Sequence, residues 1–564
     1  MKFKKKKNQP KNIIKQNLSF WPNLLLVLIL LLAAFLRLWN LAHYPSGLNA
    51  DEAAIGYNAY SLLETGKDEH GDPWPIHFKS FGDYKPGLYF YLVLPLVKLL
   101  GLNIWAVRLP AALLGILSVL LIMLLTKEIF REKFLANRFS LWAGFFLAIS
   151  PWHLHFTRGG WESGSALFLM LLAVWLFFKG LSKPGFFVSS VLVFCLSMYT
   201  YHSARLVVPL LFLGLMIFYR QKIFFKKNLK IIVIAVLVGL LFLAPLVKDF
   251  LGPAGVSRFS GVGLFSDEGP FWRTNELRGQ HPNPYTPEVR LLHNRLFAYG
   301  LAFVENWLDH FNGNFLFVAG DVIERSRVPE TGQMYLFDIL FLFFGFYFLL
   351  LKRPPHWRFV LLWLVVAPVA AAMTFQTPHA LRANNMIVPL LLLSSYGIVH
   401  LIDWFVNKKK TLKIILTIFL FLVIPWNLAR YLHEYYVHYA QTYPGAWEQG
   451  FEQLVWEVRN IEDEYEKVYV TDRYDQPYIL FLFYLKYPPE KFQKEVKLTP
   501  RDEFGFSTVR DFDNFHFEKI NWEELKTKSN ILVVGTPQEI NTSATILKRI
   551  YFQNGEVAFL IVQV

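Results

Sequence analysis

Cysteine and charged residues are scarce in this chain of 564 residues. Its single cysteine, Cys195, lies inside an apolar run, which excludes an intramolecular disulfide framework and a metal site built from several cysteines. Charged residues make up 18% of the chain, against roughly a quarter in a typical soluble domain. The sequence has no Walker A loop, dinucleotide fingerprint or zinc-binding helix motif, so it supports no nucleotide donor and firmly implies no cofactor, while a divalent metal is left open without support.

Apolar residues are abundant instead, and they are gathered in long runs. They make up 54% of the chain, and many runs approach the roughly 20 residues that cross a bilayer as a helix. Lipid satisfies no backbone polar group, so each crossing must be helical. We therefore predict a mainly α, polytopic membrane helical bundle of about eleven spans. The predicted spans are 21–39, 104–125, 139–156, 165–178, 186–201, 206–218, 231–245, 334–351, 359–375, 387–406 and 412–425.

The net charge of +14 comes largely from short basic connectors between the apolar runs. A nucleic-acid-binding surface needs a contiguous basic face, so nucleic acid is excluded as a partner. Basic connectors of this kind mark the cytoplasmic side of a membrane protein. They fall at alternate span ends if the amino terminus, with its basic tail 1–20, is cytoplasmic. The connectors are 2–15, 127–133, 179–183, 220–230, 351–358 and 407–413.

The opposite side of the membrane then receives the long, polar segments. The membrane domain 21–430 carries a first outer loop, 40–103, and a second one, 248–333, rich in glycine, proline and asparagine. Within the first loop, 51–64 and 87–100 suit helices that lie in the membrane interface. Residues 431–564 form a small extracytoplasmic α/β domain, with a helix at 447–459 and strands at 467–471, 530–534 and 559–564.

Two short motifs in the first outer loop can carry chemistry. Asp51 and Glu52 are adjacent, so on a helix their side chains point about 100° apart and at most one of them faces a given reacting atom. The alternative role for both is to stabilise a helix start through its dipole. Lys85 precedes Pro86 and can either extend towards lipid headgroups or hold a phosphate as a point charge.

Further charged and polar groups occur at the outer ends of later spans. Any one of them is explained by an interfacial position, but several that converge from non-adjacent spans indicate a binding site. We predict that these side chains help to bind substrate: Arg158, His202, Arg205, His379 and Arg382. Asp472 and Asp475 follow a predicted strand in the tail, where turn and capping roles are expected.

The order of these motifs resembles that of the GT-C membrane glycosyltransferases, and within them the dolichyl-phosphate-mannose protein mannosyltransferase-like and aminoarabinose transferase-like group. The shared pattern is an Asp-Glu pair after the first span, then Lys85-Pro86, then Arg108-Leu109-Pro110 at the next span. Segments 151–158 and 201–205 also resemble bacterial members of the group. Tyr84 stands where the aminoarabinose transferases tend to have glutamate before the lysine, so no metal ligand is carried over.

This resemblance implies a membrane enzyme that moves a sugar from a polyprenyl-phosphate donor, undecaprenyl or dolichyl, to an extracytoplasmic acceptor that is a protein, a lipid or a glycan. It implies that Asp51 is the general base, with Glu52 as its motif neighbour, and that Lys85 contacts the carrier phosphate. We expect an inverting single displacement. A polysaccharide ligase or polymerase remains as an alternative, as does a lipid-sugar flippase, although the chain has no internal repeat of the kind common in transporters.

Overall fold

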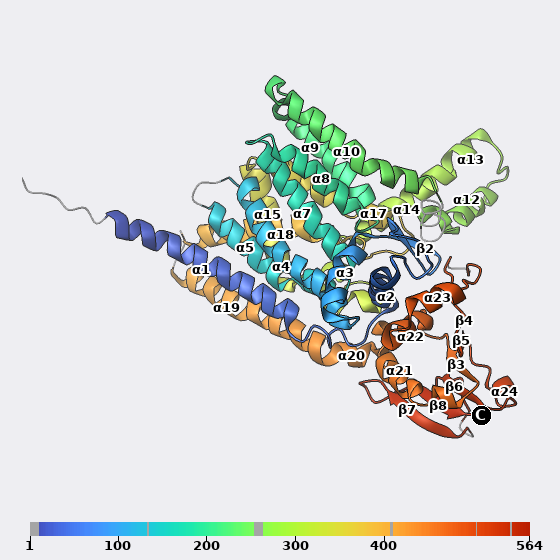
Figure 1. The fold of residues 1–564 in the computed structure, drawn as a ribbon. Coiled ribbons are helices and arrows are strands. Elements are labelled where there is room, and N and C mark those ends of the chain that lie inside the picture. Colours follow the sequence, from blue (N-terminus) through green and yellow to red (C-terminus); the bar gives the residue numbers. More distant parts are fainter. Residues whose placement is uncertain (1–10, 132–134, 253–262, 407–409, 503–504, 542–543) are drawn as a thin grey trace, which may run out of the picture.

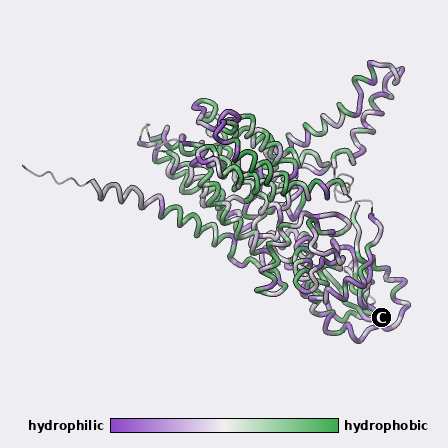
Figure 2. Tube along the Cα trace, turned by 45° about the horizontal axis from the view of Figure 1, so that its top comes forward, coloured by the Kyte–Doolittle hydropathy of each residue, from purple (hydrophilic) through white to green (hydrophobic). Residues whose placement is uncertain are grey.

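The structure, a computed structural model, describes residues 11–131, 135–252, 263–406, 410–502, 505–541 and 544–564. Helices form one elongated body, and a smaller module that contains the carboxyl terminus lies at one end of it (Figure 1). Apolar residues follow the helices of the body, whereas hydrophilic residues are spread over the smaller module (Figure 2). The predicted helical bundle with a small α/β part at the carboxyl end is confirmed.

All eleven predicted spans fall on helices. Within the described residues, seven helical segments are long and apolar enough to cross a membrane. They contain α1 (Lys11–Leu38), α4 (Ile104–Ile129), α7 (Glu162–Gly180), α9 (Ala204–Ile223), η1 (Lys226–Asn228) with α10 (Leu229–Phe250), η5 (Asn384–Met386) with α18 (Ile387–Val406), and α19 (Lys410–His433).

The other four predicted spans are shorter helices: α5 (Ala136–Ile149), α8 (Phe186–Met198), α15 (Leu336–Lys352) and α16 (Trp357–Val366). Proline accounts for one of these early ends, because the residue before a proline avoids the helical conformation. Ser150 ends α5 just before Pro151 starts α6 (Pro151–Arg158). Pro368 lies between α16 and α17 (Val369–Ala372), where it has no N–H to donate to the helix.

Helix α18 lies at the centre of the bundle, with 94% of its apolar window buried. It packs against α15, α5 and α16. Its contact with α15 is made through backbone, because a Cβ at Gly397 would lie 2.0 Å from the Phe341 carbonyl oxygen, and one at Gly345 would lie 2.2 Å from that of Leu393. Small residues at a helix interface permit this close approach, which adds van der Waals contact that lipid cannot supply.

One end of the bundle collects the basic connectors. Lys179 Nζ lies 2.6 Å from Glu128 Oε1, and the Tyr219 hydroxyl forms a 2.7 Å hydrogen bond with His356 Nδ1. The rings of Phe178 and His356, 4.8 Å apart, join these two pairs. Connectors near 127–133, 179–183, 220–230 and 351–358 therefore meet at the same end, as the charge pattern predicts.

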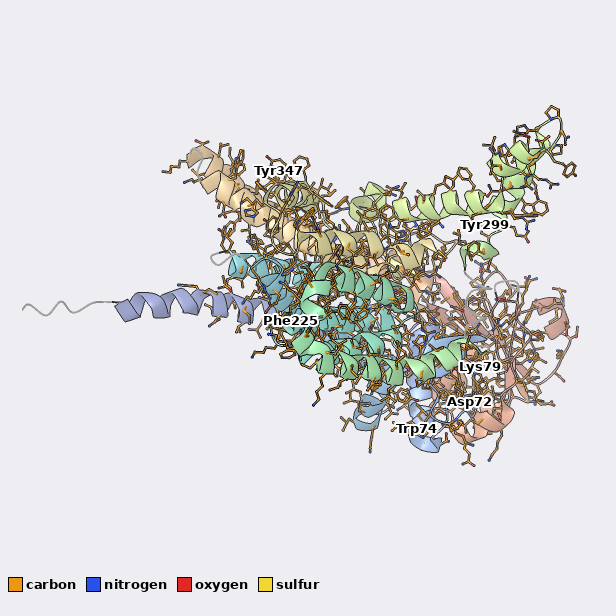
Figure 3. The ribbon with its side chains drawn as sticks, turned by 90° about the horizontal axis from the view of Figure 1, so that it is seen from above. Asp72, Trp74, Lys79, Phe225, Tyr299 and Tyr347 are labelled. Carbon is orange, nitrogen blue, oxygen red and sulfur yellow. The ribbon has the colours of Figure 1, made fainter. Side chains whose placement is uncertain are left out.

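The first outer loop folds at the other end of the bundle, where Figure 3 shows its residues Asp72, Trp74 and Lys79 away from Phe225 of the α9–α10 connection. It contains α2 (Ala50–Thr65), a hairpin of β1 (His77–Ser80) and β2 (Asp83–Pro86), and α3 (Leu88–Leu100). Both helices match the predicted ones. A capping box starts α2: the Asn49 side chain accepts from the Glu52 amide, and the Glu52 side chain accepts from the Asn49 amide.

The second outer loop is largely helical rather than irregular. Asn294 accepts from the Phe297 amide at 2.8 Å, and Thr286 accepts from the Val289 amide at 3.4 Å, so polar residues of this loop act as helix caps. Helices α12 and α13 project beyond the bundle (Figure 1). The elements are η2 (Leu264–Ser266), α12 (Gly269–Gly279), α13 (Pro287–Leu292), α14 (Arg295–Asp309), η3 (Asn314–Val318) and η4 (Glu324–Ser326).

The carboxyl-terminal module is a six-stranded sheet with helices. Its strand order is β4-β5-β3-β6-β8-β7, with β3 parallel to both β5 and β6, and α22 packs against α2 of the first loop. The strands at the predicted positions are β3 (Lys467–Thr471), β6 (Ile531–Gly535) and β8 (Val557–Gln563). The other elements are η6 (Glu434–His438), α20 (Tyr439–Thr442), η7 (Pro444–Trp447), α21 (Phe451–Arg459), η8 (Glu462–Glu464), α22 (Pro477–Leu485), α23 (Pro489–Glu495), β4 (Asp511–Phe512), β5 (Phe515–Glu518), α24 (Trp522–Leu525) and β7 (Ile546–Tyr551).

The backbone contact between α15 and α18 predicts a strong effect of a single methyl group. Gly397→Ala should lower the melting temperature of the purified protein, because overpacking a tight contact costs about 1–3 kcal/mol. Gly300→Ala on α14 is the matched control, since nothing lies within 4 Å of the added Cβ there. Equal melting temperatures of the two variants in a detergent thermal-shift assay would contradict the packing.

Candidate active site

Asp51 and Lys85 form an ion pair in the first outer loop. Asp51 is the second residue of α2, and Lys85 lies on β2. Lys85 Nζ contacts Asp51 Oδ1 and lies 4.7 Å from the centre of the Phe81 ring. The Asp51 side chain is 33% exposed and that of Lys85 14% exposed. The folded loop thus brings the two predicted residues together and leaves part of the carboxylate open.

Glu52 is completely buried and fully engaged. Its two carboxylate oxygens accept from Arg108 Nε at 2.8 Å and Nη2 at 2.9 Å, and Oε1 also accepts from the Gly160 amide at 2.6 Å. This forked geometry is the strong form of an arginine–carboxylate pair. Glu52 therefore joins α2 to α4 and to the turn before α7, and its acceptor positions are occupied.

Two buried arginines hold the backbone that precedes α2. Arg108 donates to the carbonyl oxygens of Pro45 at 2.8 Å and Gly47 at 2.6 Å. Arg158 donates to those of Leu36 at 2.8 Å, Trp39 at 2.9 Å and Tyr44 at 3.1 Å. Arg158, predicted as a substrate-binding residue, is thus placed in a structural network with these carbonyl groups.

Arg205 and His202 lie near the hairpin that carries Lys85. Arg205 at the start of α9 donates to the His77 ring and to the Met198 carbonyl oxygen, and His202 lies in the turn just before it. His77 also contacts Asp249. Burial, and then the Arg205 charge, lower the pKa of His77 to about 3, so its ring is neutral. In the hairpin, His77 faces Pro86, the residue after Lys85.

His379 and Arg382 belong to a separate cluster beside the second outer loop. The His379 amide donates to His310 Nε2 at 3.1 Å, its ring lies 3.6 Å from Asp321, and Arg382 donates to Thr374 at 2.8 Å. Burial raises the pKa of Asp321 to about 6. The chain continues from Asp321 through a short turn into η4, and it thereby connects this cluster with the Asp51 region.

Three further charged residues lie around Asp51, and no sequence motif links them to it. They are Arg325 on η4, and Glu448 and Asp475 from the carboxyl-terminal module. Arg325 Nη1 lies 3.7 Å from Glu448 Oε1 and 3.6 Å from Asp475 Oδ2. Burial acts to lower the pKa of Arg325, but Glu448, Asp51 and Asp475 outweigh it and the net shift is upward. Asp475 therefore meets a cation rather than serving the expected turn role, whereas Asp472 pairs with Arg510 at 2.9 Å.

Strained backbone is found at the same place. Non-glycine residues rarely adopt a positive φ, and such strain persists only where the surroundings impose it, often at functional sites. Phe81 under Lys85 has φ 56°, Glu448 has φ 46°, and Gln476 beside Asp475 has φ 49°. The first outer loop and the carboxyl-terminal module thus each carry such a residue, and Arg325 of η4 pairs with one of them, Glu448.

A cluster able to hold a metal ion lies elsewhere in the described chain. His433, Glu434 and His438 offer ligand atoms within 4.8 Å of one another at the end of α19. The two histidines are five positions apart, and the π-helical turn of η6 brings their rings to 4.8 Å.

The chain has the polytopic helical fold found in GT-C membrane glycosyltransferases. Residues 84–247 match the family described as dolichyl-phosphate-mannose-protein mannosyltransferase. The candidate mannosyltransferase YkcB of Bacillus subtilis is 29% identical over 167 residues, which make up 28% of this chain. The chain spans about a fifth of that relative, with 21% of its length aligned.

Two solved structures share the fold. ArnT from Cupriavidus metallidurans in the apo state has a TM-score of 0.52 and 12% identity, over 97% of this chain and 98% of its own. The oligosaccharyltransferase AglB from Archaeoglobus fulgidus has a TM-score of 0.51 and 15% identity, over 82% of this chain and 63% of its own. The resemblance to GT-C membrane glycosyltransferases predicted from the sequence is confirmed.

The Glu52–Arg108 pair predicts opposite outcomes for neighbouring carboxylates. Glu52→Gln leaves the Arg108 charge buried without a counter-charge, and breaking a buried pair in this way costs about 3–5 kcal/mol. Asp51→Asn removes a partly exposed carboxylate and should leave the melting temperature nearly unchanged. The comparison requires a thermal-shift measurement in one detergent. A Glu52→Gln protein as stable as Asp51→Asn would refute the structural role.

Proposed function

We propose that this chain is an integral membrane glycosyltransferase that transfers a sugar from an undecaprenyl- or dolichyl-phosphate donor to an extracytoplasmic acceptor. The family match of residues 84–247 and the GT-C fold support the transferase class. AglB, which shares the fold, is known in complex with an inhibitory peptide and a dolichol-phosphate, which supports a polyprenyl-phosphate donor.

This proposal rests on the different surroundings of Asp51 and Glu52. Glu52 has its oxygens occupied by Arg108 and the Gly160 amide, so it positions α2 and does not exchange protons. Asp51 is partly exposed, and Lys85 is its ion-pair partner. Transfer from a lipid-linked phosphate requires a carboxylate that accepts a proton and a cation that stabilises the phosphate, and Asp51 and Lys85 are such a pair.

The reaction follows from these two groups. The acceptor hydroxyl attacks the anomeric carbon of the donor sugar and gives its proton to Asp51. The new carbon–oxygen bond forms as the bond from that carbon to the phosphate oxygen breaks, and its electron pair leaves on the carrier phosphate. Attack from the opposite side inverts the anomeric configuration. Lys85 exchanges Asp51 for the phosphate when the donor binds, which frees the base and stabilises the departing charge.

Neighbouring side chains supply the rest of the phosphate site in this proposal. Arg205 and His202 stand beside the hairpin that carries Lys85, through the contact of Arg205 with His77. Arg158 is assigned a structural role instead, since its donors hold carbonyl groups. No step requires a resident metal ion.

The proposed site faces away from the cytoplasm. The basic connectors lie at the end of the bundle opposite to the first outer loop, and an excess of lysine and arginine marks the cytoplasmic side. The amino terminus is then cytoplasmic, and the proposed domains are the membrane domain 21–430 and the extracytoplasmic domain 431–564. Nucleotide-sugar donors are cytoplasmic, so a sugar carried by a membrane-anchored polyprenyl phosphate suits this side better.

The proposal predicts that Asp51→Asn abolishes sugar transfer while the protein stays folded. Loss of a general base should lower turnover about 10²–10⁴-fold. The purified protein is incubated with a panel of polyprenyl-phosphate sugars, and release of the carrier phosphate is followed. Asp72→Asn is the matched control, since Asp72 is an exposed acid in the same loop.

Near-normal transfer by Asp51→Asn would remove it as the base. A polysaccharide ligase or polymerase would instead depend on the second outer loop. In that case, substitution of its acidic residues would abolish activity while Asp51→Asn would not. The acidic residues to substitute there are Asp267, Glu276, Glu288 and Glu305.

A further inference from the structure

A pocket of about 650 Å³ lies between the turn after α1 and the carboxyl-terminal module. One wall is the backbone that Arg108 and Arg158 hold, and the other is formed by α21 and residues near the end of β7. The lining residues are Asn40, Ala42, His43, Tyr44, Ser46, Gly47, Ile104, Glu448, Gln449, Gly450, Glu452, Gln453, Trp456, Glu457, Tyr484, Tyr551 and Gln553.

Most residues that line this pocket carry a polar group. Among the described residues that line it there is no lysine or arginine, while three glutamates and three glutamines are present. A phosphate or another anion would therefore meet acidic side chains and no lysine or arginine here. Amide and carboxylate groups offer donors and acceptors that suit a ligand rich in hydroxyl groups.

Two exposed aromatic side chains also line the pocket. Trp456 on α21 is 69% exposed and Tyr551 on β7 is 52% exposed. Aromatic side chains together with a few polar groups at a concave site are typical of a ligand-binding surface. The electron-rich face of an aromatic ring attracts the weakly positive C–H groups of a sugar ring, and its flat surface matches the ring in size.

The walls of the pocket are held in place. Gln449 Nε2 donates to Ser46 Oγ at 2.7 Å, and the backbone N–H of Gln553 donates to Gln449 Oε1 at 3.2 Å. At Gly47, with φ 99°, an added Cβ would lie 2.1 Å from the Trp447 carbonyl oxygen. The first outer loop and the module are therefore in direct backbone contact beside the pocket.

Glu448 connects this pocket with the candidate active site. It lines the pocket, it lies 3.7 Å from Arg325, and it is only 4% exposed. Its Oε2 atom is buried and has no hydrogen-bond partner among the described residues. Burial raises the pKa of Glu448 well above its usual value against the opposing effect of Arg325, and Asp475 and Asp51 add to the rise. A buried polar atom without a partner is costly, and a ligand hydroxyl would satisfy it.

We propose that this pocket binds the acceptor and that the acceptor is a saccharide without anionic groups. The acceptor is then a glycan rather than a protein or a lipid. The inference rests on the proposed transferase function. Trp456 and Tyr551 provide the stacking surfaces, the glutamine and glutamate side chains bind hydroxyl groups, and Glu448 is the lining residue that also meets Arg325. The carboxyl-terminal module thereby selects the acceptor, while the first outer loop performs the transfer.

Direct binding measurements on the full chain in lipid nanodiscs test this inference. The probes are mannotetraose, cellotetraose and chitotetraose, with tetragalacturonate as the anionic counterpart and a serine- and threonine-rich peptide as the protein counterpart. We expect at least one neutral saccharide to bind, and Trp456→Ala to weaken it at least roughly tenfold, equivalent to about 1.4 kcal/mol. Trp272→Ala on α12 is the matched control, since Trp272 is 61% exposed and does not line the pocket.

The outcomes separate this inference from the proposed function. Asp51→Asn should keep full saccharide affinity although it loses transfer. The inference is overturned if no neutral saccharide binds, if tetragalacturonate or the peptide binds more tightly, or if Trp456→Ala binds like the control. Tyr551→Ala repeats the test on a second element, the strand β7, and melting temperatures equal to that of the parent protein confirm folding. Saccharide binding with no carrier release from any donor would instead count against the proposed function.

Discussion

The buried ion pair between Glu52 and Arg108 organises the whole candidate site. Two charges removed from water are tolerated only when every donor and acceptor is used, and here both residues meet this condition. Because Arg108 belongs to α4 and Glu52 to α2, the pair fixes a polar loop to an apolar bundle. Asp51 precedes Glu52 in the same helix, so its side chain points in another direction, where it contacts Lys85 and stays partly exposed.

The charged cluster around Asp51 is assembled from three parts of the chain. The first outer loop supplies Asp51 and Lys85, η4 supplies Arg325, and the carboxyl-terminal module supplies Glu448 and Asp475. Positive φ values at Phe81, Glu448 and Gln476 show that packing between these parts imposes conformations that the local sequence disfavours. The module is thus part of the site, and α2 is packed between it and the bundle.

Much of this arrangement follows from local sequence. Bilayer thickness and the need to satisfy backbone groups predict the spans, and all of them fall on helices, although 139–156 and 359–375 are each divided between two. The Asp-Glu and Lys-Pro motifs lie close together because one loop carries both. The prediction is less complete where polar composition hides structure, as in the second outer loop, whose asparagine, threonine and proline residues cap helices. Arg158 has the residue type of a phosphate ligand, yet its donors bind carbonyl groups, and no span-end pattern distinguishes these two uses.

By itself the sequence determined the apolar helices, the gathering of basic connectors at one end of the bundle, the strands of the tail and the closeness of the two motifs within one loop. These are properties of residues close together in the chain, where length, periodicity and charge act directly. Only the tertiary structure decided that Glu52 is buried against Arg108, and that Glu448 and Asp475 face Arg325 next to Asp51. Contacts between such distant residues depend on how whole elements pack, and no local pattern encodes the position of one module against another.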